Sequence, residues 1–375
     1  MKIIKIAENY DIYSDNLEVL EKLPSKAFVV KFAKMKGFYL QEYKIADVNE
    51  KIYGQHLKKV EKALRTFKSF DRNLGIILSG KKGIGKSLFA KLLAKESMKN
   101  GLPVIIVDEY IPGIASYLTE IEQEAVVMFD EFDKTFGDIK RGDGEQDPQA
   151  SMLSLFDGFL SGKKMFIITC NEIYKLNDFL INRPGRFHYH FMFNYPSVDE
   201  IEEYLHDKLK EEYYPEINKV VMFSRKVNLN YDCLRAIAYE LNTGISFNEA
   251  IKDLNIINMN ETFYLTKLVF KNGLPMENEP YQFDIFESGT VHLPRFSYGN
   301  SEACIEVSFN PADIIFDPNI GNQIVPAKDL NIEYDFYYLD EDNEKDMKNK
   351  EKIKNLIPDF LIIERTRDKQ YHYIV

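Results

Sequence analysis

The sequence predicts an α/β fold with a parallel sheet in residues 50–196, followed by a helical segment and a β-rich C-terminal region. Three observations lead to this prediction. Short apolar runs alternate with helical segments between Leu74 and about Asn194, residues 197–257 have a helical pattern throughout, and strands broken by Gly, Pro and Asn follow Asn260. Short apolar strands that alternate with helices are typical of a parallel sheet covered on both faces.

The chain length predicts more than one domain. Its 375 residues are too many for one ordinary domain, and 45% hydrophobic with 29% charged residues describes a globular protein with an ample core. We expect a short β-rich N-terminal extension at 1–49, the α/β domain at 50–196, a helical lid at 197–258 and an acidic, β-rich domain at 259–375.

Individual elements follow from local patterns. The segment "KAFVVKFAKMKGFYLQEYKI" predicts two strands around a turn at Lys36–Gly37, and "HLKKVEKALRTFKSFD" has the apolar spacing of a helix. The sheet strands are expected in "LGIILSG", "PVIIVDE", "AVVMFDE", "KMFIITCN" and "HYHFMFN". In the C-terminal region, "FYLTKLVF", "YQFDIF", "ACIEVSF" and "DFLIIERT" predict strands, and "DEDNEKDMKNKEKIKN" predicts an exposed helix or a mobile loop.

Cysteine usage and hydropathy bear on the cellular location. Cys170, Cys233 and Cys304 are far apart and form no disulfide or zinc pattern, which favours a reducing compartment. No apolar stretch reaches the roughly 18 residues that a transmembrane helix needs, and the N-terminus lacks the apolar core of a signal peptide. We therefore expect a cytoplasmic protein without a membrane segment.

The negative charge is concentrated in the C-terminal third. Residues 261–375 hold 12 Lys and Arg against 21 Asp and Glu, a balance of −9, which leaves −2 of the net charge of −11 for the rest. An acidic surface repels phosphate backbones, so this part is not expected to bind nucleic acid. This charge distribution does not decide whether another part of the chain forms a basic channel.

A phosphate-binding loop is the strongest motif. "GKKGIGKS" lies between a predicted strand and a predicted helix and fits G-x-x-x-x-G-K-[S/T]. Its glycines let backbone N–H groups surround a phosphate chain at a helix N-terminus. Lys86 is expected to reach the β- and γ-phosphates and Ser87 to bind Mg²⁺. The candidate nucleotide-binding residues here are Gly80, Lys81, Lys82, Gly83, Ile84, Gly85, Lys86, Ser87 and Leu88.

Polar residues at the ends of two later strands complete a candidate catalytic set. Asp130 and Glu131 follow the apolar run "AVVMF", and Asn171 ends "KMFIITCN". Asp130 is placed to hold Mg²⁺ and Glu131 to polarise an attacking water. Asn171 is placed to orient that water, although Asn at the end of a strand is also common turn chemistry.

The order of these motifs resembles that of AAA+ ATPases. A P-loop, "FDEFD", a strand that ends in Asn171, "NRPGRF" and a helical segment follow one another over about residues 50–257. "NRPGRF" is similar to the AAA clade proper. The short span between "PVIIV" and "AVVMF", together with "SLFDGFLSGKKMFIITCNE", is loosely similar to the mitochondrial Rieske-protein translocase subgroup. The resemblance implies an AAA+ P-loop NTPase sheet with a helical lid, ATP hydrolysis with Mg²⁺, and a homo-oligomeric, hexamer-like ring.

The resemblance also implies further site residues. Arg183 and Arg186 are implied to be arginine fingers that reach the γ-phosphate bound by the neighbouring subunit, which suits their permanent charge; an intrachain salt bridge is the alternative. Ile52, Tyr53 and Gly54 of "KIYGQ" match an adenine-contacting segment, or form an ordinary turn. Gly244 and Ser246 of "LNTGISFNEA" match a lid position close to the nucleotide.

Two other features carry less functional weight. Tyr110 of "EYIPG" is the nearest match to a substrate-gripping pore loop, but it lies too close to its strand and is better interpreted as a packing or turn residue. His188 and His190 alternate on one face of a strand, yet no third metal ligand lies nearby.

Function is therefore expected to be Mg-dependent ATP hydrolysis by a ring that remodels or moves a protein partner. A nucleic-acid motor or replication loader built on the same ring is the alternative. A nucleotide switch without hydrolysis is a third interpretation, which the set of Glu131, Asn171 and Arg183 disfavours. The sequence names neither the client nor the pathway.

Overall fold

The computed structural model describes residues 2–6, 8–13, 16–48, 51–137, 147–157, 162–256, 262–286, 289–297, 304–336 and 344–366. The chain divides into two compact units. The first is formed by Met1–Val221 with Asn228–Asp253, and the second by Met222–Val227 with Leu254–Val375.

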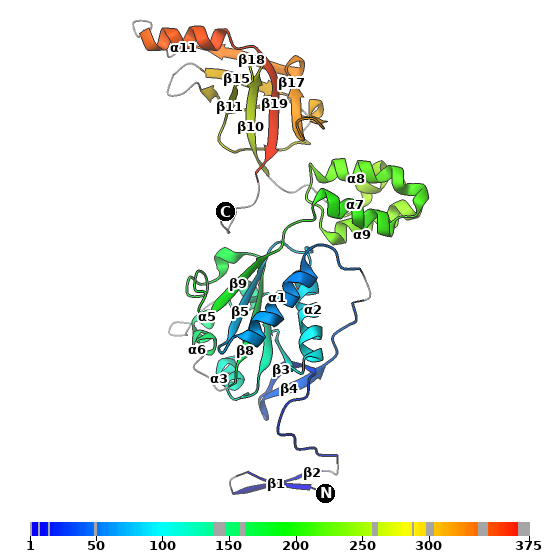
Figure 1. The fold of residues 1–375 in the computed structure, drawn as a ribbon, viewed down its shortest axis with the longest axis vertical. Coiled ribbons are helices and arrows are strands. Elements are labelled where there is room, and N and C mark those ends of the chain that lie inside the picture. Colours follow the sequence, from blue (N-terminus) through cyan, green and yellow to red (C-terminus); the bar gives the residue numbers. More distant parts are fainter. Residues whose placement is uncertain are drawn as a thin grey trace. The chain divides into compact units, whose positions relative to one another are not determined.

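In the described part of the chain, the first unit is built on a sheet of seven strands (Figure 1). Six of them are parallel, and the seventh is the antiparallel partner of β3 at one edge. The predicted parallel sheet is therefore confirmed. The strands, in their order across the sheet, are β4 (Gly37–Tyr43), β3 (Ala27–Ala33), β6 (Val104–Val107), β7 (Ala125–Phe129), β8 (Lys164–Cys170), β5 (Leu74–Ser79) and β9 (Phe187–Met192).

The N-terminal segment contributes to this sheet. β3 and β4 form the hairpin expected around Lys36–Gly37, and β3 then pairs in parallel with β6. The boundary predicted at residue 49 therefore does not separate these strands from the α/β domain; residues 49 and 50 lie outside the described residues. β1 (Lys2–Ile6) and β2 (Asn9–Tyr13) form a two-stranded sheet of their own.

Helices cover both faces of the sheet, which explains why its central strands are apolar throughout. Along β7, Val127 and Phe129 belong to the cluster that includes residues of α3, α4 and α6, whereas Val126 and Met128 belong to the cluster that includes residues of α1 and α2. The helices are α1 (His56–Ser69), α2 (Lys86–Lys99), α3 (Ile114–Thr119), α4 (Phe132–Thr135), α5 (Pro148–Ser151) and α6 (Leu153–Phe156).

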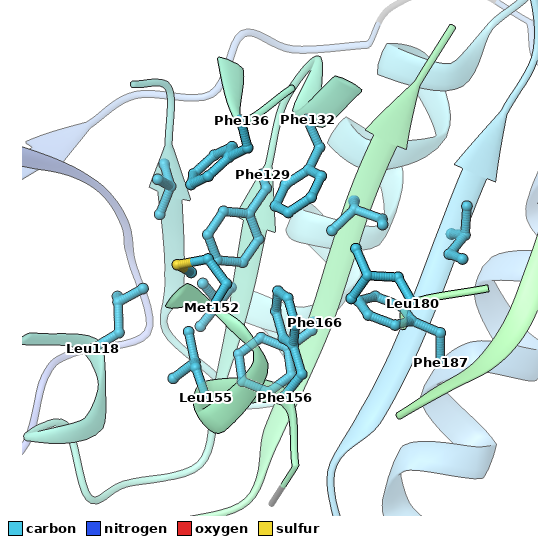
Figure 2. Close-up of a cluster of buried hydrophobic side chains, with 14 of the residues drawn as sticks. Leu118, Phe129, Phe132, Phe136, Met152, Leu155, Phe156, Phe166, Leu180 and Phe187 are labelled. Carbon is cyan, nitrogen blue, oxygen red and sulfur yellow. The ribbon is translucent and has the colours of Figure 1, made fainter. Parts of the chain in front are cut away.

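An aromatic cluster supports the short helix α4 (Figure 2). Phe132 and Phe136 stack with their ring centroids 4.5 Å apart, and both rings meet Phe129 of β7 edge to face. Phe156 of α6 also packs edge to face against Phe129 and against Phe166 of β8. Because these side chains are fully buried, they hold the segment that directly follows β7 in one place.

The predicted lid is helical. It begins with a capping box in which Ser197 and Glu200 satisfy each other's backbone N–H groups. The predicted end of the lid at residue 258 lies outside the described residues. None of the described helices is long and apolar enough to cross a membrane. The lid elements are α7 (Val198–Lys208), the 3₁₀ helix η2 (Glu211–Glu216), α8 (Ile217–Ser224), α9 (Tyr231–Asn242) and α10 (Phe247–Asp253).

The second unit is rich in strands, as expected. Its two antiparallel sheets share one buried core that includes Leu268, Ile305 and Leu361. The charged segment after residue 340 forms the helix α11 (Glu344–Lys354), while its first residues lie outside the described part. One sheet holds β11 (Pro275–Glu277), β10 (Thr262–Phe270), β12 (Tyr281–Phe283), β19 (Pro358–Arg365), β17 (Asn322–Pro326) and β16 (Ile315–Asp317); the other holds β13 (Val291–His292), β15 (Cys304–Phe309), β14 (Phe296–Ser297) and β18 (Leu330–Asp335).

Candidate active site

The loop between β5 and α2 has the conformation that its glycines predict. Gly80 and Gly85 have φ angles of 142° and 98°, which favour glycine. A Cβ at Gly80 would lie 2.3 Å from the carbonyl oxygen of Phe193, and one at Gly85 would lie 2.6 Å from Nε2 of His56. Both positions therefore require glycine. The loop leads directly into the 14-residue helix α2, whose N-terminus favours an anion.

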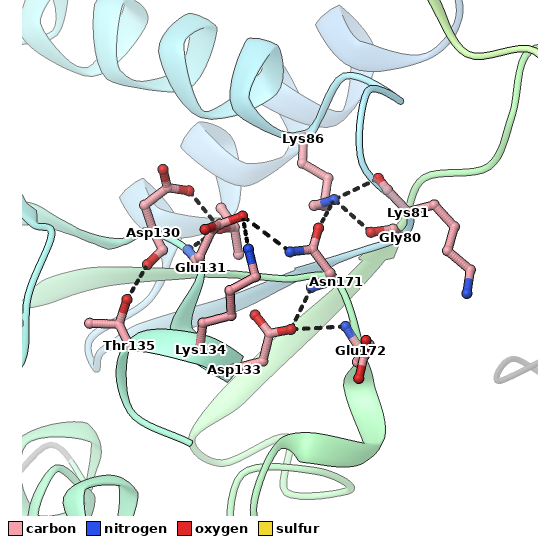
Figure 3. Close-up of polar contacts among 11 residues, drawn as sticks. Gly80, Lys81, Lys86, Asp130, Glu131, Asp133, Lys134, Thr135, Asn171 and Glu172 are labelled. Atoms are coloured by element: carbon pink, nitrogen blue, oxygen red, sulfur yellow. Dashed lines mark hydrogen bonds and ion pairs between the residues drawn. The ribbon is translucent and has the colours of Figure 1, made fainter. Parts of the chain in front are cut away.

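Lys86, the first residue of α2, bends back into the loop (Figure 3). Its ammonium donates hydrogen bonds to the carbonyl oxygens of Gly80 (2.5 Å) and Lys81 (2.7 Å) and to Oδ1 of Asn171 (3.0 Å). The residue is only 8% exposed, and burial lowers the pKa of the amine. A buried ammonium held by neutral carbonyls is well suited to an anionic ligand.

Asp130 and Glu131 lie at the carboxyl end of β7, and both form hydrogen bonds with the hydroxyl of Thr169 on β8. The Thr169 hydroxyl donates to Oδ1 of Asp130 (2.7 Å) and accepts from the backbone N–H of Glu131 (2.8 Å). Glu131 adopts φ 44°, a left-handed conformation that is unusual for a residue other than glycine. Such backbone strain occurs at functional sites when the surrounding packing maintains it.

Glu131 accepts two side-chain hydrogen bonds at Oε1. One comes from the Lys134 ammonium at 2.6 Å and the other from Nδ2 of Asn171 at 3.3 Å. These contacts lower the pKa of the Glu131 carboxyl, with the bond to Lys134 as the larger cause. Glu131 is therefore an exposed carboxylate that stays ionised and is already paired.

Asn171 connects the two halves of the site. Its carbonyl oxygen accepts from Lys86 while its amide nitrogen donates to Glu131, so one side chain links the phosphate-binding loop to the acidic pair (Figure 3). The structure thus brings together four residues that the sequence predicted as a site: Lys86, Asp130, Glu131 and Asn171.

The side chains at this edge also fit a magnesium ion. Ser87 and Asp130 carry exposed side-chain oxygens, and Asp130 uses only Oδ1 for its bond to Thr169. Mg²⁺ takes few protein ligands of this type and completes its shell with water and phosphate oxygens. No group of three or more His, Cys, Asp or Glu side chains that could hold a metal occurs among the described residues.

The two arginines of the Pro184–Gly185 turn have different surroundings. Arg186 is half-buried; it forms a bidentate ion pair with Asp157 of its own chain and donates to the carbonyl of Phe179 (2.9 Å). This is the intrachain salt bridge that was the alternative to a finger toward a neighbouring subunit, and it occupies the fork of the guanidinium. Arg183 is exposed and lies over the ring of Phe179, 5.9 Å from its centroid.

Tyr53 and Gly54 pack against the lid. The Tyr53 hydroxyl donates to Asp207 of α7 (3.1 Å), and burial raises its pKa to about 12. A Cβ on Gly54 would lie 2.5 Å from Oε1 of Glu200, also on α7. The Tyr53 side chain therefore joins core and lid rather than offering a ring to a ligand. A base contact by Ile52 or by the backbone of Gly54 stays a prediction.

The lid residues beside the phosphate-binding loop are not those expected. Asn230 donates to the carbonyl of Lys82 (3.3 Å), and the N–H of Tyr231 donates to the carbonyl of Gly83 (3.3 Å). Both stand at the start of α9, whereas Gly244 and Ser246 follow its end. A 12-residue helix is about 18 Å long, so Gly244 and Ser246 lie at the end of α9 that is remote from this contact. That they lie close to the nucleotide stays a prediction.

Tyr110 is a packing residue, as its position near the strand suggested. Its ring meets Phe136 edge to face at 5.4 Å, and it is half-buried against the aromatic core. His190 lies 2.5 Å, Nε2 to Oγ, from Ser79. Neither observation adds a functional group to the site.

Five residues near the site were missed by the sequence reasoning. Three of them contact the predicted site residues: Thr169 and Lys134 bond to Glu131, and Asp133 bonds to Asn171. The other two, Asn230 and His56, lie against the phosphate-binding loop. The acid spacing of "DEFD" was a signal for Asp133. The others became visible only in the fold, since their partners are distant in sequence.

Comparison with known proteins agrees with this geometry. Residues 76–195 match the model of the family described as ATPase family associated with various cellular activities (AAA). The ATP-dependent zinc metalloprotease FtsH 1 of Phytoplasma mali (strain AT) is 30% identical over 145 residues, which cover 35% of this chain and 24% of that protein. The 26S proteasome regulatory subunit 4 homolog of Oryza sativa subsp. japonica is 33% identical over 141 residues, which cover 33% of this chain and 31% of that protein.

The chain spans less than a third of the length of these two relatives. Among solved structures, a RuvB mutant of Thermotoga maritima has a TM-score of 0.40 at 14% identity, with 56% of this chain and 72% of that chain covered.

Proposed function

Residues 76–195 form an AAA ATPase domain, and on this premise we propose that the chain binds ATP with Mg²⁺ and hydrolyses it. The single observation that carries the proposal is the hydrogen-bond chain from Lys86 through Asn171 to Glu131. It places a phosphate-binding amine and a carboxylate base on either side of one amide, and hydrolysis of a terminal phosphate uses groups of both kinds.

Each residue of the proposed site has its own role in the hydrolysis. Lys86 exchanges the carbonyls of Gly80 and Lys81 for β- and γ-phosphate oxygens, which it can do because a charged partner outcompetes a neutral one. Glu131 accepts a hydrogen bond from the attacking water and polarises it, while Nδ2 of Asn171 orients the water. Ser87 and Asp130 hold the metal; Mg²⁺, when bound, offsets the negative charge of the phosphates.

We further propose a homo-oligomeric ring in which Arg183 completes the neighbouring site. Arg183 supports this because it is exposed and, within the described part of the chain, forms no ion pair. A guanidinium that reaches a γ-phosphate stabilises the charge of the transition state. Arg186 instead holds the turn through Asp157, so only one finger is assigned.

A protein is the favoured client. The relatives are, by name, an ATP-dependent metalloprotease and a proteasome regulatory subunit, both of which concern proteins. The unbridged thiols of Cys170, Cys233 and Cys304 support a reducing, cytoplasmic location as part of the same proposal.

Phosphate release tests the hydrolysis directly. Lys86→Ala should abolish nucleotide binding, whereas Glu131→Gln should bind ATP and lose turnover. Removing Mg²⁺ with EDTA should stop the wild-type reaction, and adding Mg²⁺ back should restore it. If Glu131→Gln hydrolysed ATP at the wild-type rate, the assignment of the base would be wrong.

One surface favours the second candidate function, a nucleic-acid motor. Lys58, Lys62 and Arg65 share one face of α1, and Arg72 follows at the end of the same helix. All four are exposed, and none pairs with a carboxylate among the described residues. Lys62 lies 4.7 Å from the ring centroid of Tyr189 on the edge strand β9. A basic strip without carboxylate partners on an acidic protein is a place where a phosphate backbone could bind, although Arg72 already donates to the carbonyl of Gly185.

A salt titration separates the two candidates. Binding of single-stranded and duplex DNA should be measured over a range of salt concentrations for the wild type and for a Lys58→Gln, Lys62→Gln, Arg65→Gln triple variant. A motor that grips phosphates should show a steep salt dependence that the triple variant loses. Weak binding with no difference between the two proteins would leave the protein client as the better proposal.

A further inference from the structure

Asp133 is a buried carboxylate directly beside the proposed catalytic residues. It lies on α4, two residues after Glu131, and is only 1% exposed. Its Oδ2 accepts the backbone N–H groups of Asn171 (3.0 Å) and Glu172 (3.1 Å). No step of the proposed hydrolysis uses this side chain, yet its two partners belong to the turn that carries Asn171 (Figure 3).

The carboxylate is not explained by stability alone. In the described part of the chain Asp133 has no salt bridge, and its Oδ1 is buried without a hydrogen-bond partner. Burying a charged oxygen without a partner costs free energy, while the backbone N–H groups of Asn171 and Glu172 need only the one oxygen Oδ2. Such exceptions in a native structure call for a reason, and a functional site is one of the common reasons.

The geometry shows what the carboxylate connects. Asp133 and Glu131 are on the same segment, which the stacked Phe132 and Phe136 hold against the core. Asn171 follows the end of β8, 38 residues later in the chain than Asp133, and reaches Glu131 by a hydrogen bond of 3.3 Å. The bond from Asp133 to the Asn171 backbone therefore fixes the amide-bearing turn relative to the base-bearing helix.

We propose that Asp133 is a positioning residue of the ATPase site: its Oδ2 holds the Asn171–Glu172 turn so that Asn171 can orient the water beside Glu131. The inference rests on the proposed hydrolysis. It assigns Asp133 no contact with ATP, so its loss should slow turnover and leave binding nearly unchanged. A displacement of about 1 Å at a reacting group can reduce the rate by about 100-fold.

Two substitutions separate the hydrogen bonds from the charge. Asp133→Asn can place its amide oxygen where Oδ2 is and keep both backbone bonds, since one oxygen accepts both. It should retain kcat within about threefold of the wild type, and Asp133→Ala should lose about 10- to 100-fold in kcat with little change in KM or in ATP affinity. Asp178→Ala, which removes an exposed carboxylate from the following loop, is the matched control.

A double-mutant cycle with Asn171→Ala gives the decisive readout. If Asp133 acts through Asn171, adding Asp133→Ala to Asn171→Ala should cause no further loss of kcat, while each single variant is slow. Additive losses, or equal losses in binding and turnover, would overturn the inference. If Asp133→Ala does not fold, Asp133→Ser takes its place in the cycle, because its shorter hydroxyl cannot reach the turn. A wild type without ATPase activity would refute the proposed function itself, whereas an active wild type with a fast Asp133→Ala refutes only the role of Asp133.

Discussion

Arg186 and Asp157 form a bidentate ion pair within one chain, with Nη2 2.7 Å from Oδ2 and Nε bonded to Oδ1. Two parallel N–H···O bonds of this kind define the direction of the guanidinium as well as its position. The pair fixes the base of the Pro184–Gly185 turn and leaves Arg183 exposed at its other end. The two arginines of one short motif therefore have separate tasks.

The first prediction concerns the stability of this turn. Arg186→Ala removes the ion pair and the bond to the Phe179 carbonyl and should lower the free energy of unfolding by about 1.5–3 kcal/mol, since Arg186 is only 14% exposed. Arg183→Ala should leave the melting temperature unchanged. Thermal unfolding of both variants, and a cycle of Arg186→Ala with Asp157→Ala, measures the difference. Equal melting temperatures for the two arginine variants would contradict it.

The limits of sequence reasoning follow from where the partners of each residue lie. The strands and the phosphate-binding loop were predictable because their signals are local: apolar runs, and glycines at fixed spacing before a helix. Asp157 lies 29 residues before Arg186, so no local pattern showed that the arginine is occupied. The contact of Asn230 and Tyr231 with the loop was not predictable, because the sequence shows that α9 is a helix but not which of its ends meets Gly83. Thr169 was missed because its hydroxyl acts on residues of another strand.

The second prediction concerns pH. The Lys134 ammonium favours the charged form of Glu131 and so lowers the pKa of the base. In Lys134→Met that pKa should rise toward its ordinary value. Because the base acts when deprotonated, the acidic limb of the kcat profile should then move to higher pH. Above that limb kcat should rise, since a base of higher pKa accepts a proton more strongly.

Profiles of kcat against pH for the wild type and Lys134→Met test this. Lys134→Arg is the control, because it keeps a positive charge beside Glu131 and should keep the wild-type limb. An acidic limb that stays in place or moves to lower pH would show that Lys134 does not control the base.

The third prediction concerns the strand-rich unit. The Phe223 ring lies 6.3 Å from that of Phe286, and the guanidinium carbon of Arg225 lies 3.7 Å from the ring centroid of Phe316; both contacts are within this unit. Deleting residues 261–375 should keep ATPase activity and lose client binding. The deletion should also expose Phe223, so the truncated protein that carries Phe223→Ser should aggregate less than the truncated protein that keeps Phe223. Light scattering and phosphate release measure both effects, and a truncation unable to bind nucleotide would show that the strands complete the ATPase unit.

The last prediction returns to Arg183. As a finger in trans it is not needed for ATP binding, so Arg183→Ala should bind ATP almost normally and hydrolyse it about 10³- to 10⁵-fold more slowly, as arginine fingers in general do. The decisive experiment mixes two inactive proteins. Arg183→Ala has an intact loop and Glu131 but no finger, and Glu131→Gln has the finger but no base.

In a mixed ring some interfaces join the intact site of the first variant to the intact finger of the second, and activity should partly return. A role within one chain cannot give this result, since neither chain contains both groups. Subunit exchange is verified by native mass spectrometry of differently tagged proteins, and a mixture of Lys86→Ala with Glu131→Gln is the control that should stay inactive, because neither of its chains has a complete site. Persistent inactivity in rings shown to be mixed would mean that Arg183 serves its own chain.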